Sequence, residues 1–178
     1  MLKYDYFSIL RALTDNSREA VEYACKKRAQ AHIKISKIRG GSYKTLCELE
    51  EALFSEFLPP LDRSSIAAYA HALCAVTDSA LVYSRSSSLQ YAGISTKGFD
   101  SSCVSLCEIL AEGCAMLEKI KKSSEIPRVE EFREKKTRAL ESICEGACAP
   151  QIFVARQDLL FAISDAFDSL LALILKSI

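Results

Sequence analysis

The stretch from Pro59 to Tyr83 constrains the fold of this chain more than any other. Its two consecutive prolines cannot continue a helix, and Asp62 stands where a side chain can accept the backbone N–H groups left free at a helix start. Apolar or small residues then recur at steps of three and four, at Ile66, Tyr69, Leu73, Val76, Ala80 and Tyr83. Because this spacing places them on one side of a helix, the stretch is predicted to be a long helix of a bundle.

The same pattern returns near the end of the chain, 87 positions later. There Leu160-Phe161-Ala162-Ile163-Ser164-Asp165-Ala166 matches Leu73-Cys74-Ala75-Val76-Thr77-Asp78-Ser79 in its apolar, small, hydroxyl and acidic positions. Pro150 precedes the second stretch as Pro60 precedes the first. An offset close to half the chain indicates two similar halves, each closed by a long helix with an aspartate at the same place. The alternative is a chance similarity between two amphipathic helices.

The remaining sequence also favours helices throughout. No alternating strand-like run competes, and 6 Gly and 4 Pro leave few turns. At 178 residues the chain fits one domain, 1–178, which can bury roughly 70% of the surface that its unfolded form exposes. We therefore predict an all-α six-helix bundle made of two three-helix up-down repeats, 1–88 and 98–178. The other five helices are expected at about 2–38, 43–57, 101–122, 127–147 and 153–176, with a turn at Gly40-Gly41-Ser42.

The charge balance and the N-terminus limit the partners and the compartment. Lys and Arg number 23, as do Asp and Glu, so the basic excess typical of nucleic-acid binding is absent. The N-terminus lacks the basic-then-apolar order of a signal peptide, and no uncharged run reaches the roughly 20 residues of a membrane helix. We therefore expect a cytoplasmic protein that meets a membrane only through a protein partner. Its 8 cysteines are then expected to be free thiols.

The sequence offers little for catalysis. It has only two histidines, His32 and His71, and it lacks the GxSxG turn that presents a nucleophile. Gly40-Gly41-Ser42-Tyr43-Lys44-Thr45 does not have the GxxxxGK[ST] spacing of a phosphate-binding loop. We therefore predict that the protein is not an enzyme.

One group of residues has the spacing of a metal site. His71, Cys74 and Asp78 are spaced i, i+3 and i+7, so they share one helix face, and their side chains are types that bind zinc or iron. Asp165 and Asp168 occupy the corresponding face of the last helix. These five residues are the candidate ligands of a divalent metal ion, with a purely structural role for the histidine and the cysteine as the alternative.

The cysteines suggest a second kind of metal site. Cys103 and Cys107 lie one helical turn apart, as do Cys144 and Cys148, and thiolates inside a helical bundle can hold soft cuprous ions. The alternative is that these cysteines are small buried apolar residues, because free cysteine is among the most buried residue types.

Two stretches of the chain resemble a known family. The first, Phe57-Leu58-Pro59-Pro60-Leu61-Asp62-Arg63-Ser64-Ser65-Ile66, is followed by Ala72-Leu73 and Asp78. It is similar to the turn F-I-T-P-hydrophobic-D-R-E-D-I and the helix A-L-D-D-x-x-D of PhoU-like phosphate transport regulators, which are often encoded beside low-affinity phosphate permeases. The resemblance extends loosely to Tyr6-Phe7-x-Ile9-Leu10 and to Ile163-Ser164-Asp165. It implies six helices in two three-helix repeats.

The chain departs from this family in its metal motifs. The family's E/D-x-x-x-D motifs correspond here to Cys74-x-x-x-Asp78 and Phe161-x-x-x-Asp165, so each keeps one carboxylate of two. The family's H-E-A-D segment falls at Gly40-Gly41-Ser42-Tyr43, and near the fifth helix only Glu131 remains, opposite Arg133. A multinuclear cluster needs several anionic oxygens. The resemblance therefore implies a divergent member that kept the scaffold and lost or rebuilt the metal site.

The resemblance also implies a function. We expect a non-catalytic accessory protein of phosphate transport that docks on a phosphate permease or a sensor protein. The alternative is a metal-binding or thiolate metal-storage bundle. A third interpretation is a homo-oligomer that associates through the apolar end of its last helix, Leu170-Leu171-Ala172-Leu173-Ile174-Leu175.

Overall fold

The structure is a computed structural model that describes residues 5–26, 30–56, 59, 61–88, 97–117, 128–143 and 150–176. Over these ranges it contains six helices and no strand, which confirms the predicted all-α bundle. The helices are α1 (Tyr6–Cys25), α2 (Ala31–Ser55), α3 (Arg63–Ser88), α4 (Lys97–Met116), α5 (Val129–Ile143) and α6 (Pro150–Leu175).

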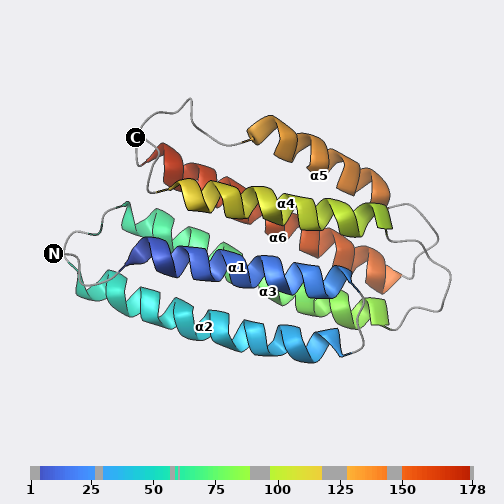
Figure 1. The fold of residues 1–178 in the computed structure, drawn as a ribbon, viewed down its shortest axis with the longest axis horizontal. Helices are drawn as coiled ribbons and strands as arrows, with labels where there is room; N and C mark the ends of the chain where they lie inside the picture. Colours follow the sequence, from blue (N-terminus) through green and yellow to red (C-terminus); the bar gives the residue numbers. More distant parts are fainter. Residues whose placement is uncertain are drawn as a thin grey trace.

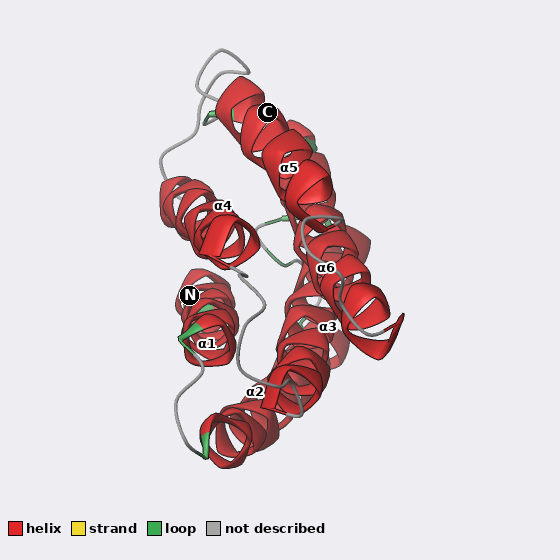
Figure 2. Ribbon diagram, turned by 90° about the vertical axis from the view of Figure 1, so that its right-hand side faces the viewer, coloured by secondary structure: helices red, strands yellow, loops and turns green. Residues whose placement is uncertain are grey.

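Four helices form the centre of the bundle, and two flank it (Figures 1 and 2). In the centre, α1 packs on α3 and α4, and α6 packs on the same two helices. α2 lies against α1 and α3, and α5 lies against α4 and α6. α3 and α6 run in opposite directions, because Lys176 at the end of α6 pairs with Asp62 at the start of α3 over 3.1 Å.

α3 and α6 bury the sides that their spacing predicted. Ile66, Tyr69 and Leu73 of α3 are fully buried, as are Leu160 and Ile163 of α6. Each large apolar side chain removed from water contributes about 1.5–3 kcal/mol to the free energy of folding. The two helices that carry the sequence repeat therefore also carry much of the core.

Buried hydroxyl groups join α1 to α3. The Ser17 hydroxyl lies 2.9 Å from the Leu73 carbonyl oxygen, and the Thr14 hydroxyl lies 3.0 Å from the hydroxyl of Tyr69. Since a buried polar group without a partner is costly, these pairs fix how the two helices sit against each other.

The start of α3 has the predicted cap. Asp62 Oδ2 accepts hydrogen bonds from the backbone N–H of Ser65 at 2.9 Å and from the Ser64 and Ser65 hydroxyls at 2.6 Å. These bonds hold the pKa of Asp62 well below its usual range. The same carboxylate also accepts a hydrogen bond from Lys176 Nζ, so it holds the end of α6 as well as the start of α3.

The predicted turn at Gly40-Gly41-Ser42 is wrong. These residues lie inside α2, and the first helix ends instead at Cys25, with Gln30 in the left-handed region at φ 65° immediately before α2. Each glycine costs about 1 kcal/mol in a helix relative to alanine. Buried Ile38 and Leu46 on either side hold the helix against its neighbours, and the buried Ser42 hydroxyl accepts a hydrogen bond from the side chain of Asn16 in α1. These contacts outweigh the cost of the two glycines.

One described helix has the length and composition of a membrane span. It is α3, over 63–87, and 56% of its most apolar 18-residue stretch is buried inside the bundle. A core helix of a globular domain passes the same test, so α3 is weak evidence for a membrane span.

Candidate functional site

Asp78 of α3 is tied to α2 by two hydrogen bonds. Arg39 Nε donates to its Oδ1 at 2.5 Å, and the Tyr43 hydroxyl donates to its Oδ2 at 2.7 Å. The Arg39 guanidinium also lies over the Tyr43 ring, 5.0 Å from the ring centre. The hydrogen bonds to Asp78 raise the pKa of Arg39 and the pKa of Tyr43, because they favour the protonated form of each donor. One carboxylate therefore joins two α2 side chains that are spaced one turn apart.

The other two α3 candidates have different surroundings. His71 Nε2 lies 2.9 Å from Glu50 Oε1 of α2 and is exposed. Cys74 is only 2% exposed, and burial raises the pKa of its thiol to about 11. His71 thus faces α2 at the surface, whereas Cys74 lies in the core as a neutral thiol.

The structure does not bring the five predicted metal ligands together, and the metal site remains a prediction. Within the described ranges, no three His, Cys, Asp or Glu side chains are placed to hold a metal ion together. The reason is that α2 packs along this side of α3 and supplies Arg39, a cation, to the carboxylate that a metal would need. The spacing in the sequence was correct for a shared helix face, but the neighbouring helix already occupies it.

Two of the four cysteines of the predicted thiolate site lie in the described core. Cys103 and Cys107 are almost fully buried, and burial raises the pKa of Cys103 well above its usual range and that of Cys107 to about 12. Both are neutral thiols at physiological pH, which agrees with the alternative that they are apolar core residues. Cys144 and Cys148 lie outside the described residues.

Asp165 and Asp168 lie on an open side of α6. Both are exposed, and neither has a hydrogen bond or an ion pair in the part of the chain that the structure describes. They belong to a row of exposed residues that we call the α6 stripe: Val154, Asp158, Phe161, Asp165, Asp168, Ala172 and Leu175. The structure thus separates the five predicted ligands. His71 and Asp78 pair with α2 and Cys74 lies in the core, whereas Asp165 and Asp168 are exposed on α6.

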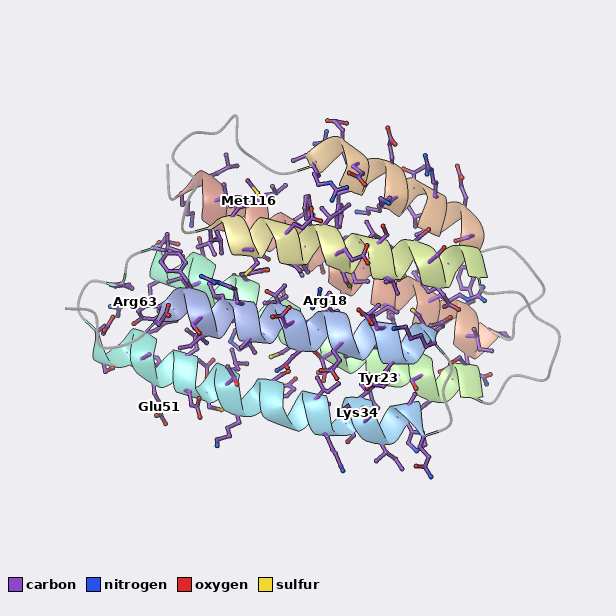
Figure 3. All side chains as sticks on the ribbon, in the orientation of Figure 1. Arg18, Tyr23, Lys34, Glu51, Arg63 and Met116 are labelled. Carbon is purple, nitrogen blue, oxygen red and sulfur yellow. The ribbon has the colours of Figure 1, made fainter. Side chains whose placement is uncertain are left out.

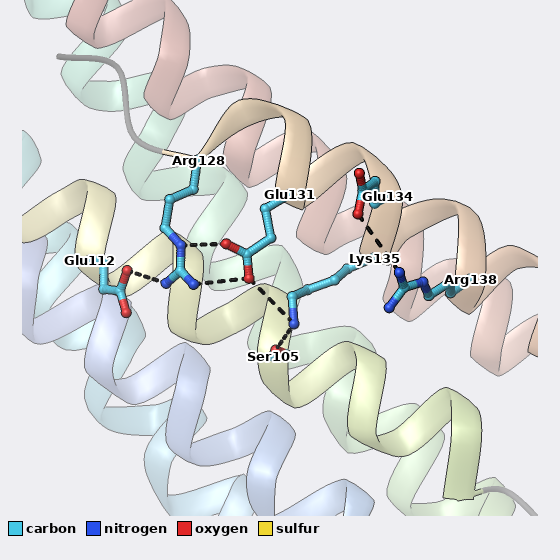
Figure 4. Close-up of polar contacts among 7 residues, drawn as sticks. All are labelled: Ser105, Glu112, Arg128, Glu131, Glu134, Lys135 and Arg138. Atoms are coloured by element: carbon cyan, nitrogen blue, oxygen red, sulfur yellow. Dashed lines mark hydrogen bonds and ion pairs between the residues drawn. The ribbon is translucent and has the colours of Figure 1, made fainter.

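No described side chain of α5 pairs with an aspartate of α6 (Figure 4). Arg128, just before α5, pairs with Glu112 of α4, and Lys135 donates to Ser105 of α4 at 2.7 Å. α5 meets α6 through apolar contact instead, since the rings of Phe132 and Phe167 stack with centres 3.7 Å apart. α5 therefore supplies no cation to α6 in the way that α2 supplies Arg39 to α3.

The sequence analysis missed a buried arginine in α6. Arg156 is fully buried, its Nη1 donates to the Ile143 carbonyl oxygen at 3.2 Å, and its guanidinium lies 5.5 Å from the centre of the Phe99 ring. In the part of the chain that the structure describes, its Nε and Nη2 have no hydrogen-bond partner. A single arginine within a strongly apolar helix was the available signal.

Over the described residues, these features define an all-α six-helix bundle in which one helix, α6, presents an acidic and apolar face that no other described segment covers. A comparison of the sequence with models of known protein families gives no match. A search of curated proteins gives no match either.

Proposed function

We propose that this chain is a PhoU-like accessory protein of phosphate transport, which docks on a phosphate permease or a sensor protein and catalyses no reaction. The observation that carries the proposal is the correspondence between α3 and α6. Both helices have 26 residues, and Asp78 and Asp165 each lie fifteen residues after the first residue of their helix, Arg63 and Pro150. The two helices also pack against each other in opposite directions.

The packing of the other helices supports the same two-repeat architecture. α1 and α4 both have 20 residues, and they lie side by side as α3 and α6 do. α2 packs on α1 and α3, and α5 packs on α4 and α6, so each contact within the first three helices has a counterpart within the last three. Two three-helix repeats are what the resemblance to PhoU-like regulators implies.

The surface features favour docking over catalysis. The hollow between the end of α2 and the start of α3, about 420 Å³, is lined by Leu53, Phe54 and Ala67 together with charged side chains at its edge. The Ser64 hydroxyl in this hollow donates to Asp62, whose carboxylate caps α3. Phe54 is 88% exposed, which suits contact with another macromolecule.

Phosphate uptake in the source organism tests the proposal. We expect deletion of the gene to change the uptake of radiolabelled phosphate, or its response to external phosphate, and the wild-type gene to restore it. Antibody detection of the permease in the same cells separates a change in activity from a change in abundance. Uptake that is identical with and without the gene, at both low and high external phosphate, would refute the proposed function.

A further inference from the structure

We infer that the α6 stripe is a docking surface for a basic amphipathic helix of a partner protein. The inference deepens the proposed function, on which it rests for the identity of the partner, and adds the chemistry of the segment that docks. It draws on the geometry of the stripe, its charges, and the way α2 covers the corresponding part of α3.

The stripe has the geometry of a helix-docking seam. Its seven residues follow one another at steps of four and three from Val154 to Leu175, so they form a nearly straight row along α6. At 1.5 Å per residue this row is about 30 Å long, which matches a partner helix of about 20 residues. Seams with this spacing are the ones along which two helices pack side by side.

The exposed apolar residues of the stripe favour a partner. Val154 is 51% exposed, Phe161 is 45% exposed and Leu175 is 57% exposed. They alternate with acidic residues instead of forming one apolar patch. A helix that packed here would remove these three side chains from water, and Phe161, near the middle, is the natural anchor.

The charges of the stripe determine the sign of the partner. Asp158, Asp165 and Asp168 are exposed and have no hydrogen bond or ion pair among the described residues. The only basic residue of α6 is Arg156, which is buried on another side of the helix. A partner that covers the stripe must therefore bring its own cations, and Lys or Arg spaced one turn apart would meet the aspartates.

The first half of the molecule shows how such an aspartate is covered by a helix. Asp78 occupies the place in α3 that Asp165 occupies in α6, and α2 presents Arg39 and Tyr43 to it from one side of a helix. The covering segment is thus a helix with a cation and an aromatic hydroxyl four residues apart. No described side chain of α5 makes this contact with Asp165. Lys135 donates to α4, Arg133 and Arg138 pair with glutamates of α5 itself, and Lys136 has no hydrogen bond or ion pair among the described residues.

The same charges disfavour the other occupants. A second copy that docked through its own α6 would place aspartates opposite aspartates, and like charges in an interface cost several kcal/mol. An anionic bilayer or a nucleic acid would be repelled in the same way. The predicted self-association through α6 is therefore not what this face favours.

Binding of a designed peptide tests the inference with the complete chain. The probe is a fluorescein-labelled, amidated helix of about three heptads, with Leu and Arg alternating along its seam and Ala and Gln elsewhere. We expect saturable binding by fluorescence anisotropy and a loss of affinity with added salt, because exposed charges are screened. We also expect a peptide with Glu in place of the seam Arg not to bind. No binding of the Arg peptide to the wild-type protein would overturn the inference.

Matched variants locate the binding surface. We expect Asp165→Lys and Phe161→Ala each to weaken binding roughly tenfold or more. Glu51→Lys on α2, where Glu51 points away from the bundle (Figure 3), and Phe153→Ala, off the stripe on the same helix, should change it by less than about twofold. Equal losses of affinity in the stripe variants and in the control variants would show that the peptide responds only to net charge or to general apolarity. This result would overturn the inference. Far-UV circular dichroism confirms that each variant is folded.

Further measurements distinguish the other possible occupants of the stripe. They also distinguish a failure of the docking inference from a failure of the proposed function. A wild-type dimer in sedimentation that Phe161→Ala dissociates, or binding to phosphatidylserine vesicles that Phe161→Ala removes, would overturn the inference in favour of a second copy or a membrane. Peptide binding at the stripe in a protein whose deletion leaves phosphate uptake unchanged would overturn the proposed function alone. Altered uptake on deletion together with no peptide binding would overturn the docking inference alone.

Discussion

Asp78 and Asp165 hold the same position in two packed helices of equal length, yet only Asp78 has a partner. Its carboxylate accepts hydrogen bonds from Arg39 and Tyr43 of α2, whereas Asp165 is exposed and has no hydrogen bond or ion pair in the described residues. The difference arises from the flanking helices, because α2 presents a cation to α3, whereas no described cation of α5 pairs with α6. The two halves thus share positions but differ in what covers them.

This difference predicts unequal effects on stability. We expect Asp78→Asn to lower the free energy of unfolding by up to about 1 kcal/mol, because it removes a partly exposed ion pair and weakens a hydrogen bond to Tyr43. Asp165→Asn should change it by less than about 0.5 kcal/mol, since an exposed residue without a partner has little to lose. Urea denaturation of both variants at neutral pH and low salt measures the two values.

A double-mutant cycle checks the cause of the Asp78 effect. If Arg39 is the partner that matters, Asp78→Asn should have a smaller effect in an Arg39→Gln background than in the wild type. Additive effects of the two substitutions, or equal losses for Asp78→Asn and Asp165→Asn, would contradict the assignment of a single paired carboxylate.

The sequence predicted the helices well where the pattern and the capping chemistry agree. At Asp62 a cap, two preceding prolines and a regular apolar spacing all indicate the same helix start, and the structure confirms it. At Gly40 and Gly41 the local residues favoured a turn, but the energy lost by two glycines in a helix is smaller than the packing energy of their buried neighbours. Tertiary contacts of this kind are not visible in a local pattern.

The candidate site shows a similar limit of prediction from a local sequence pattern. The spacing of His71, Cys74 and Asp78 correctly placed them near one side of α3, but it could not show what the neighbouring helix brings to that side. Arg39 and Tyr43, one turn apart in α2, were the missed signal, since a cation and a hydroxyl at this spacing suit a carboxylate on an adjacent helix. The pairing of helices decided between a metal ligand and an ion pair.

The cysteines predict a clear order of chemical labelling. Among the six described cysteines, Cys47 is exposed, whereas Cys74, Cys103, Cys107 and Cys114 are buried and burial raises the pKa of each of these four thiols. Because the thiolate is the nucleophile, we expect iodoacetamide at pH 7.5 to alkylate Cys47 first and the four buried residues only after denaturation. Peptide mass spectrometry over time measures the order. Early labelling of Cys107 in the folded protein would contradict the packing of α4.

The buried thiols also predict a loss of stability at alkaline pH. Burial raises the pKa of Cys107 to about 12 in the folded protein, whereas an unfolded cysteine ionises near about 8.5. The folded-state pKa is the higher one, so this contribution to stability is complete below about pH 8.5 and is lost as the pH rises toward the folded value. We expect the free energy of unfolding to fall by about 2 kcal/mol for such a thiol between pH 8.5 and pH 10.

Urea denaturation at pH 7.5 and pH 10 checks this slope. Burial also raises the pKa of Cys103 and of Tyr83, so the wild-type slope should exceed that of one group. In Cys107→Ala the loss between the two pH values should be smaller by the share of that one thiol, whatever the substitution costs at neutral pH. An unchanged slope in this variant would show that Cys107 ionises equally well in the folded protein.

Arg156 provides the strongest test of the core. A buried guanidinium loses its hydration, at a cost of several kcal/mol, and here one hydrogen bond to the Ile143 carbonyl oxygen and the Phe99 ring offset part of that cost. Two of its nitrogens have no hydrogen-bond partner among the described residues. Because apolar residues of similar volume often replace buried charges without loss, we expect Arg156→Met to leave the free energy of unfolding unchanged or to raise it by about 1–4 kcal/mol.

Arg156→Ala separates the contribution of volume from that of charge. It removes the same charge but leaves a cavity, so it should be about 2–5 kcal/mol less stable than Arg156→Met. Urea denaturation of both variants measures this difference. If Arg156→Met is instead less stable than the wild type by more than about 2 kcal/mol, the unpartnered nitrogens of Arg156 must have a partner in solution, such as a buried water or an anion. The sign of the Arg156→Met effect therefore shows whether this arginine is a burden on the core or part of a polar contact.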